Sequence, residues 1–162
     1  MGERPPSKRQ RIVKLTLDPR TVGRRSPEVE QERHLAIFDL LEKNHFALAG
    51  RGAGPYHLRV AIAENRLVLH VNDSRERPLE TVLLPMSPFR GLIRDYFIVC
   101  ESYYEAIRRA SRSRIEAIDA GRRSLHDEGA ELLRKHLAEK VDIDFDTGRR
   151  LFTLLSLLHV RG

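Results

Sequence analysis

Apolar and polar residues alternate along several short segments of the chain, which is the pattern of strands with one covered face. These segments are Arg11–Leu17, His45–Ala49, Tyr56–Glu64, Arg66–Asn72, Leu79–Leu84 and Val141–Asp146. A tight turn around Asn65 and a polar turn at Asp73–Arg77 would join three of them into an antiparallel meander. The first segment alternates apolar with basic residues, and we expect it to form a half-buried or edge strand.

Helices are predicted where apolar residues recur every three or four positions. Ser26-Pro27 and Ser87-Pro88 each place a capping serine before a proline at the first helical position. The first helix would run to about Asn44, with a stripe traced by Leu35, Phe38 and Leu41. The second helix has the clearest stripe in the sequence, formed by Phe89, Leu92, Ile93, Tyr96, Cys100, Tyr103 and Ile107.

The C-terminal part of the chain predicts two more helices. The pattern is helical from about Arg114 to Ala138, after a break at Ser111–Arg114. Asp146 would then cap a last helix that has no polar side, so we expect that helix to be central and buried. The expected fold is α+β: one domain in which a small antiparallel sheet is packed by about four helices, mostly C-terminal.

The net charge modifies this picture only at the N-terminus. The chain has 162 residues, 41% of them apolar, and its formal charge is +6. Residues 1–25 contain eight Lys or Arg and two Asp or Glu, which accounts for the whole excess. We therefore expect a flexible basic arm at residues 1–10 and a single domain over residues 11–162. Such an arm adds affinity for phosphates or acidic partners, although a solvated tail is the simpler interpretation.

Cysteine content and hydropathy indicate a cytosolic protein. The single cysteine, Cys100, cannot form an internal disulfide, and its position on a helical stripe favours a buried, inert thiol. The first residues carry charge with no apolar run behind them, so we expect no signal peptide. The longest apolar run, near Leu151–Val160, is too short to cross a bilayer.

Four longer segments resemble a known bacterial family. They are SPEVEQERHLAIFDLLE (Ser26–Glu42), RDYFIVCESYYEAIRRA (Arg94–Ala110), IEAIDAGRRSLHDEGAELL (Ile115–Leu133) and IDFDTGRRLFTLL (Ile143–Leu155). Together they are similar to the group catalogued as uncharacterised protein family 0262, over nearly the whole chain after the arm. The resemblance implies a small cytosolic bacterial protein without an established activity, and it assigns no functional residue.

Several apparent ligand motifs fit structural roles better. GRGAGP (Gly50–Pro55) precedes a strand rather than a helix and is better explained as a hairpin connection than as a phosphate-binding loop. Asp142, Asp144 and Asp146 share one strand face but match no calcium or phosphatase template, so we expect a solvated face. The histidines lack zinc-site spacing, and no metal or cofactor is expected. Glu105 is placed to pair with Arg109 on a helix surface, as a bridge rather than as an acid/base partner of Glu101.

GRRSLHDEG (Gly121–Gly129) is the strongest candidate site, and two local structures compete for it. If Gly121 ends a helix and Ser124 caps the next, the exposed N–H groups and two arginines suit an anion. An unbroken helix is favoured, because one interior glycine costs only about 1 kcal/mol. On that helix Arg122 falls within the apolar arc with His126 one turn later. Arg122 would then face either an internal carboxylate or a bound anion.

The leading functional hypothesis is a non-enzymatic binding or regulatory module that acts through a protein partner. The alternative is an enzyme or sensor for a small phosphate- or carboxylate-bearing ligand, held by Arg122 and His126 with help from Arg149 or Arg150. A third hypothesis is nucleic-acid binding through the basic N-terminal arm. An enzyme predicts a pocket in which polar groups converge, whereas a partner-binding module predicts an exposed apolar patch.

Overall fold

A mixed four-stranded sheet forms one layer of the protein. The computed structural model describes residues 9–19, 27–50 and 54–159. The strand order is β1-β3-β4-β5, with bounds β1 (Ile12–Leu17), β3 (Tyr56–Ala63), β4 (Arg66–Asn72) and β5 (Pro78–Pro85). The predicted meander β3–β5 is confirmed, and its first turn places Glu64 and Asn65 at φ 50° and 64°, the left-handed region that asparagine tolerates.

The edge strand β1 differs from the prediction of an all-antiparallel sheet, because it pairs with β3 in parallel. Parallel neighbours need a long crossover, and here a helix lies between the two strands in the sequence. A second, two-stranded sheet pairs β2 (Phe46–Leu48) with β6 (Val141–Ile143). The segment Gly50–Pro55 therefore joins strands of different sheets, so the predicted hairpin is wrong; residues 51–53 lie outside the described part.

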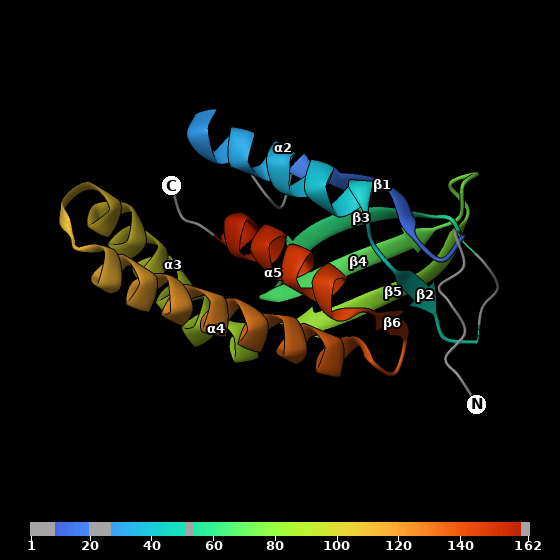
Figure 1. The fold of residues 1–162 in the computed structure, drawn as a ribbon. Helices are drawn as coiled ribbons and strands as arrows, with labels where there is room; N and C mark the ends of the chain where they lie inside the picture. Colours follow the sequence, from blue (N-terminus) through green and yellow to red (C-terminus); the bar gives the residue numbers. More distant parts are fainter. Residues whose placement is uncertain (1–8, 20–26, 51–53, 160–162) are drawn as a thin grey trace.

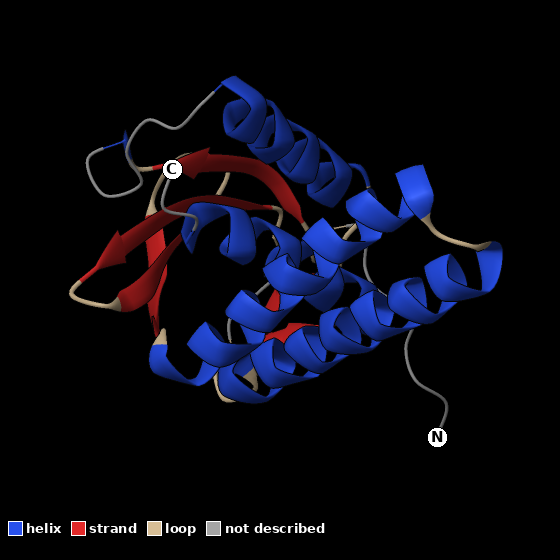
Figure 2. Ribbon diagram, turned by 90° about the vertical axis from the view of Figure 1, so that its left-hand side faces the viewer, coloured by secondary structure: helices blue, strands red, loops and turns tan. Residues whose placement is uncertain are grey.

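Four helices cover one face of the sheet (Figures 1 and 2). They are α2 (Pro27–Glu42), α3 (Ser87–Arg109), α4 (Arg112–Leu137) and α5 (Phe145–His159). Helix α5 lies against the sheet, with α2 on one side and the α3–α4 pair on the other (Figure 1). The prediction of a central, buried last helix is confirmed, since Leu151, Phe152, Leu154, Leu155, Leu157 and Leu158 all belong to the core.

Helix α4 runs unbroken through Gly121, which confirms the favoured interpretation. Ser111 caps it by accepting a hydrogen bond from the Arg114 N–H at 3.4 Å. The alternative in which Ser124 caps a separate helix is therefore excluded. Arg122 and His126 consequently lie on one continuous helix, one turn apart.

The other helix starts are shifted from their predicted residues. Ser87 is the first residue of α3, the cap position is Met86, and no side chain caps that helix. Asp144, not Asp146, caps α5: its Oδ1 accepts the Thr147 N–H at 2.8 Å. Asp146 is an exposed residue of the first turn. The predicted cap at Ser26 lies outside the described residues.

We expect Asp144→Ala to lower the free energy of unfolding by about 1 kcal/mol, the usual cost of losing an N-cap side chain. Asp146→Ala removes a carboxylate from the same turn without removing a capping bond, and its cost should be a few tenths of a kcal/mol. Urea denaturation of both variants measures the difference. Equal losses would mean that Asp144 does not act as the cap.

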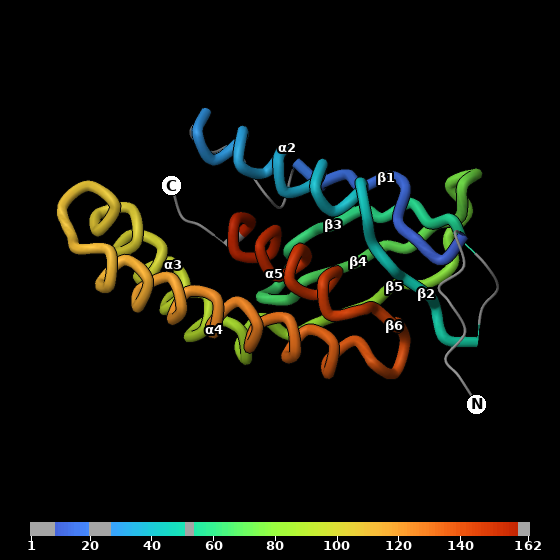
Figure 3. Tube along the Cα trace, in the orientation of Figure 1, coloured from blue at the N-terminus to red at the C-terminus, as the bar shows by residue number. Residues whose placement is uncertain are grey.

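The apolar stripes of α2 and α3 are not fully buried, contrary to the sequence pattern. Helix α2 buries Arg33, Ala36 and Leu40 instead of the predicted stripe, and Leu35 and Phe38 are 55% and 64% exposed. It packs against the protein along one side only, so the neighbouring stripe is left uncovered. On α3, Ile107 is 52% exposed, because the end of the α3–α4 hairpin extends beyond α5 (Figure 3).

Candidate functional site

A groove lies between α2 and α3 on the helical side of the protein, and we call it the α2–α3 groove. Its volume is about 400 Å³. Helix α5 forms its floor and α4 contributes Arg122. The groove is lined by Glu32, Leu35, Ala36, Asp39, Tyr96, Phe97, Cys100, Glu101, Tyr103, Tyr104, Arg122, Thr153, Ser156 and Leu157.

Helical spacing explains why each wall presents these side chains. The α2 wall consists of residues i, i+3, i+4 and i+7, counted from Glu32, so all four share one helix face. The two middle positions of that face are Leu35 and Ala36, and carboxylates stand at both ends. The α3 wall is largely aromatic. The groove therefore has an apolar centre and acidic margins.

Large apolar side chains on both walls are left open to solvent. Leu35 on the α2 wall is 55% exposed, and Tyr104 on the α3 wall is 66% exposed. Phe38, one turn after Leu35, continues the apolar surface outward along α2. Contiguous exposed apolar residues beside a concavity are typical of an interaction site rather than of an ordinary surface.

Arg122 faces this groove, but its guanidinium group forms an ion pair with a carboxylate of the same helix. Its Nε and Nη2 lie 3.0 and 2.6 Å from Oδ1 of Asp119, and its guanidinium lies 5.0 Å from the Tyr103 ring centroid. The hydrogen bonds to Asp119 raise the pKa of Arg122. Of the two partners considered from sequence, the structure places an internal carboxylate beside Arg122.

His126 is engaged beneath the groove rather than free for a ligand. Its Nε2 lies 2.8 Å from the Arg149 carbonyl oxygen and 2.8 Å from Thr153 Oγ1. Because the carbonyl only accepts, we assign the proton to Nε2. The ring stacks on Tyr96 at 5.5 Å, and burial lowers the pKa of His126, so the imidazole is neutral at pH 7.

The two remaining predicted site residues, Arg149 and Arg150, have different surroundings. Arg149 lies 3.3 Å from an Asp127 carboxylate oxygen and near the Phe145 ring. Arg150 lines an adjoining open hollow together with His126, Lys43 and others. The structure therefore brings His126 and Arg150 to one hollow and Arg122 to the neighbouring groove. The four residues do not converge on a single point.

Two titratable groups on the α3 wall of the groove, Tyr96 and Cys100, remain protonated. Burial raises the pKa of Tyr96 to about 12, and its hydroxyl contacts the side chains of Cys100 and Thr153. Burial also raises the pKa of the half-buried Cys100 thiol. A nucleophilic cysteine needs its thiolate, so this surrounding favours the inert thiol expected from the sequence.

Three carboxylates that line the groove form no ion pair with another described residue, although Asp39 also borders the hollow lined by Lys43 and Arg150. Glu32, Asp39 and Glu101 form no ion pair with any residue of the described part of the chain. By contrast, Glu105 pairs with Arg109 at 3.9 Å, as the sequence predicted. Sequence reasoning weighed Glu101 only as half of an acid/base pair and did not consider Glu32 or Asp39. Their common feature, that they border one groove, appears only when α2 is placed beside α3.

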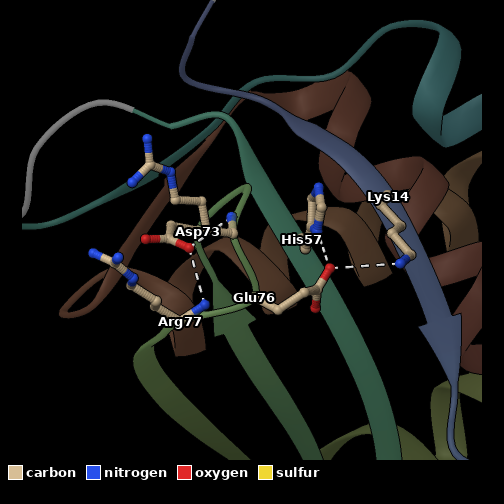
Figure 4. A network of polar contacts seen from close by, with 6 residues as sticks. Lys14, His57, Asp73, Glu76 and Arg77 are labelled. Carbon is tan, nitrogen blue, oxygen red and sulfur yellow. Dashed lines mark hydrogen bonds and ion pairs between the residues drawn. The ribbon is translucent and has the colours of Figure 1, made fainter.

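A separate polar network holds the β4–β5 loop at the edge of the sheet (Figure 4). Lys14 and His57 both contact one carboxylate oxygen of Glu76, and the hydrogen bond from His57 lowers the pKa of Glu76. Asp73 Oδ1 accepts the backbone N–H groups of Arg75 and Arg77 at 2.8 and 2.9 Å. These charges are satisfied by one another, so the network serves to fix the loop.

The described residues were compared with the requirements of a metal cluster and of a membrane-spanning helix. Over residues 9–19, 27–50 and 54–159, no group of three or more His, Cys, Asp or Glu side chains could hold a metal ion. Asp142, Asp144 and Asp146 are exposed, in agreement with a solvated face. None of the helices in that same part has the length and apolar character to span a membrane.

Comparison with known proteins identifies the family. The model of the uncharacterised protein family UPF0262 matches residues 9–161. A UPF0262 protein of Nitrobacter hamburgensis is 50% identical over 164 residues and covers 100% of both chains. Relatives in Rhodopseudomonas palustris and Paramagnetospirillum magneticum are 51% and 50% identical, covering 98% and 95% of this chain and 97% and 98% of their own. No solved structure matches. The chain is a member of the bacterial family UPF0262.

Proposed function

We propose that this protein works by binding another protein, and that a helical segment of the partner lies in the α2–α3 groove. The observation that carries the proposal is the exposure of Leu35 and Tyr104 on opposite walls of one groove. A helix bound in such a groove buries its apolar face between two helices, which is a common mode of peptide recognition. Burial of these side chains would supply much of the binding free energy.

The chemistry of the groove favours binding over catalysis. A general base or nucleophile needs a pKa near the working pH or an activated proton. Here Tyr96 and Cys100 keep their protons, and His126 donates its proton to a backbone carbonyl. Arg122, the cation that an anionic ligand would require, already has Asp119 as its partner. The small-anion hypothesis therefore receives less support than the partner hypothesis.

Site-specific photo-crosslinking in the bacterium that encodes the protein tests the proposal. A benzophenone amino acid at position 104 should give a discrete adduct with one protein, because Tyr104 forms the rim of the groove. The matched control replaces Leu83, which is 51% exposed on the sheet strand β5, and should not give that adduct. The captured protein is then purified and its affinity measured by calorimetry.

The purified pair decides the outcome. Leu35→Glu should weaken the affinity by tenfold or more, about 1.4 kcal/mol, because it brings a charge into the apolar centre. It should change the free energy of unfolding by no more than about 0.5 kcal/mol, since Leu35 is exposed. Equal affinities of wild type and Leu35→Glu would overturn the proposal. An adduct between two copies of this chain would show that the groove binds a second copy of the protein and not a different protein.

A further inference from the structure

We infer that the segment bound in the α2–α3 groove is basic as well as apolar, and that Glu32, Asp39 and Glu101 select it. This inference rests on the proposed function and specifies the chemistry of the partner. It follows from the unequal balance of charge in the groove. Three carboxylates border the apolar centre, while Arg122, the one cation among the described residues that line it, pairs with Asp119, which also pairs with Arg123.

The three carboxylates lack ion-pair partners within the described chain, and, unlike other unpaired carboxylates such as Glu128 and Glu139, they border the apolar groove. Most acidic residues of α4 are paired, among them Asp119 with Arg122 and Glu116 with Arg112 at 3.4 Å. Glu32, Asp39 and Glu101 have no such cation among the described residues. A segment that covers the groove would remove water from these carboxylates. Unless it brings positive charge to them, the cost of burying unpaired negative charges would lower its affinity.

The spacing of the carboxylates specifies where the positive charges must lie. Glu32 and Asp39 are seven residues apart on α2, so they stand about 10 Å apart along the helix axis. A partner helix lying along α2 would meet them with Lys or Arg residues two turns apart on one flank. Glu101, on the opposite wall, calls for a basic residue on the other flank. Between the flanks, an apolar stripe would face Leu35 and Ala36.

Selection from a library of helical peptides tests this specificity directly. The library keeps an apolar stripe constant and varies the flanking positions among Lys, Glu and Gln. It is selected against wild type, against the double variant Glu32→Lys/Asp39→Lys, and against Glu128→Lys/Glu139→Lys. The last variant has the same net charge but changes exposed residues outside the groove. A fourth target, Leu35→Glu, identifies peptides that bind elsewhere.

Wild type and the Glu128→Lys/Glu139→Lys control should both enrich peptides with lysine on the flanks, and the groove variant should enrich glutamate. A lysine-rich peptide selected on wild type should bind the groove variant about tenfold more weakly, and its affinity should fall as salt increases. Groove-dependent peptides without a charge preference would overturn this inference and leave the proposed function standing. If no peptide depends on Leu35, the proposed docking groove itself is refuted.

Discussion

Phe152→Ala is expected to lower the free energy of unfolding by about 3–5 kcal/mol, the range for truncating a buried phenylalanine. Phe152 is fully buried at the contact of three helices. Its ring meets Tyr96 of α3 edge-on at 5.6 Å and His126 of α4 at 6.0 Å. Because these neighbours are held by different helices, they cannot all move into the cavity that truncation leaves. Urea denaturation followed by circular dichroism measures the loss.

Phe38→Ala is the matched control, because it makes the same chemical change on an exposed side chain. Phe38 is 64% exposed, so its truncation should change the free energy of unfolding by no more than about 0.5 kcal/mol. A loss for Phe152→Ala as small as that of the control would refute the packing of α5 against the α3–α4 pair. Because α5 forms the floor of the α2–α3 groove, that result would also contradict the geometry of the groove.

Gly129→Ala is expected to destabilise the protein by about 1–3 kcal/mol, although alanine is the better helix former. A Cβ atom at position 129 would lie 2.6 Å from Phe152 Cγ, and the Phe152 side chain is fully buried. Gly121→Ala, on the same helix, meets nothing within 4 Å and should stabilise by up to about 1 kcal/mol. The two variants should therefore shift the denaturation midpoint in opposite directions.

A double-mutant cycle checks the cause assigned to the Gly129→Ala effect. If the cost arises from overlap with the Phe152 ring, it should vanish when Phe152→Ala has already removed that ring. The coupling between positions 129 and 152 should then be at least about 1 kcal/mol, beyond the few tenths seen for independent sites. Additive losses would show that the glycine is needed for some other reason.

The sequence predicted the elements well because their signals are local. Alternation identified β3, β4 and β5 nearly to the residue, and the heavy apolar content of α5 correctly implied a buried helix. The pairing of β1 with β3 carries no local signal, because alternation reveals a covered face but not the direction of the neighbour. Helix α2 has two apolar stripes, and only packing against α5 decides that Ala36 and Leu40 are the buried one.

The candidate site was predictable only in part, for the same physical reason. The sequence pattern places Arg122 within the apolar arc of α4 and His126 on its flank, and both have internal partners. The carboxylate that meets Arg122 is one turn away, within reach of sequence reasoning, whereas the Arg149 carbonyl that meets His126 belongs to another helix. The α2–α3 groove lay beyond prediction, since its walls come from segments that meet only in the tertiary structure.

The contact between α2 and α5 sets the order in which this protein can complete its fold. Strand β1 and helix α2 are synthesised early. However, β1 can pair only after β3 has been synthesised, and α2 packs on α5, the last described helix. The α3–α4 hairpin, by contrast, joins neighbours in sequence and can form while the chain is still emerging. The groove thus exists only on a chain that has been translated through α5. A partner that recognises it would bind chains in which α5 is folded and would not bind shorter nascent chains.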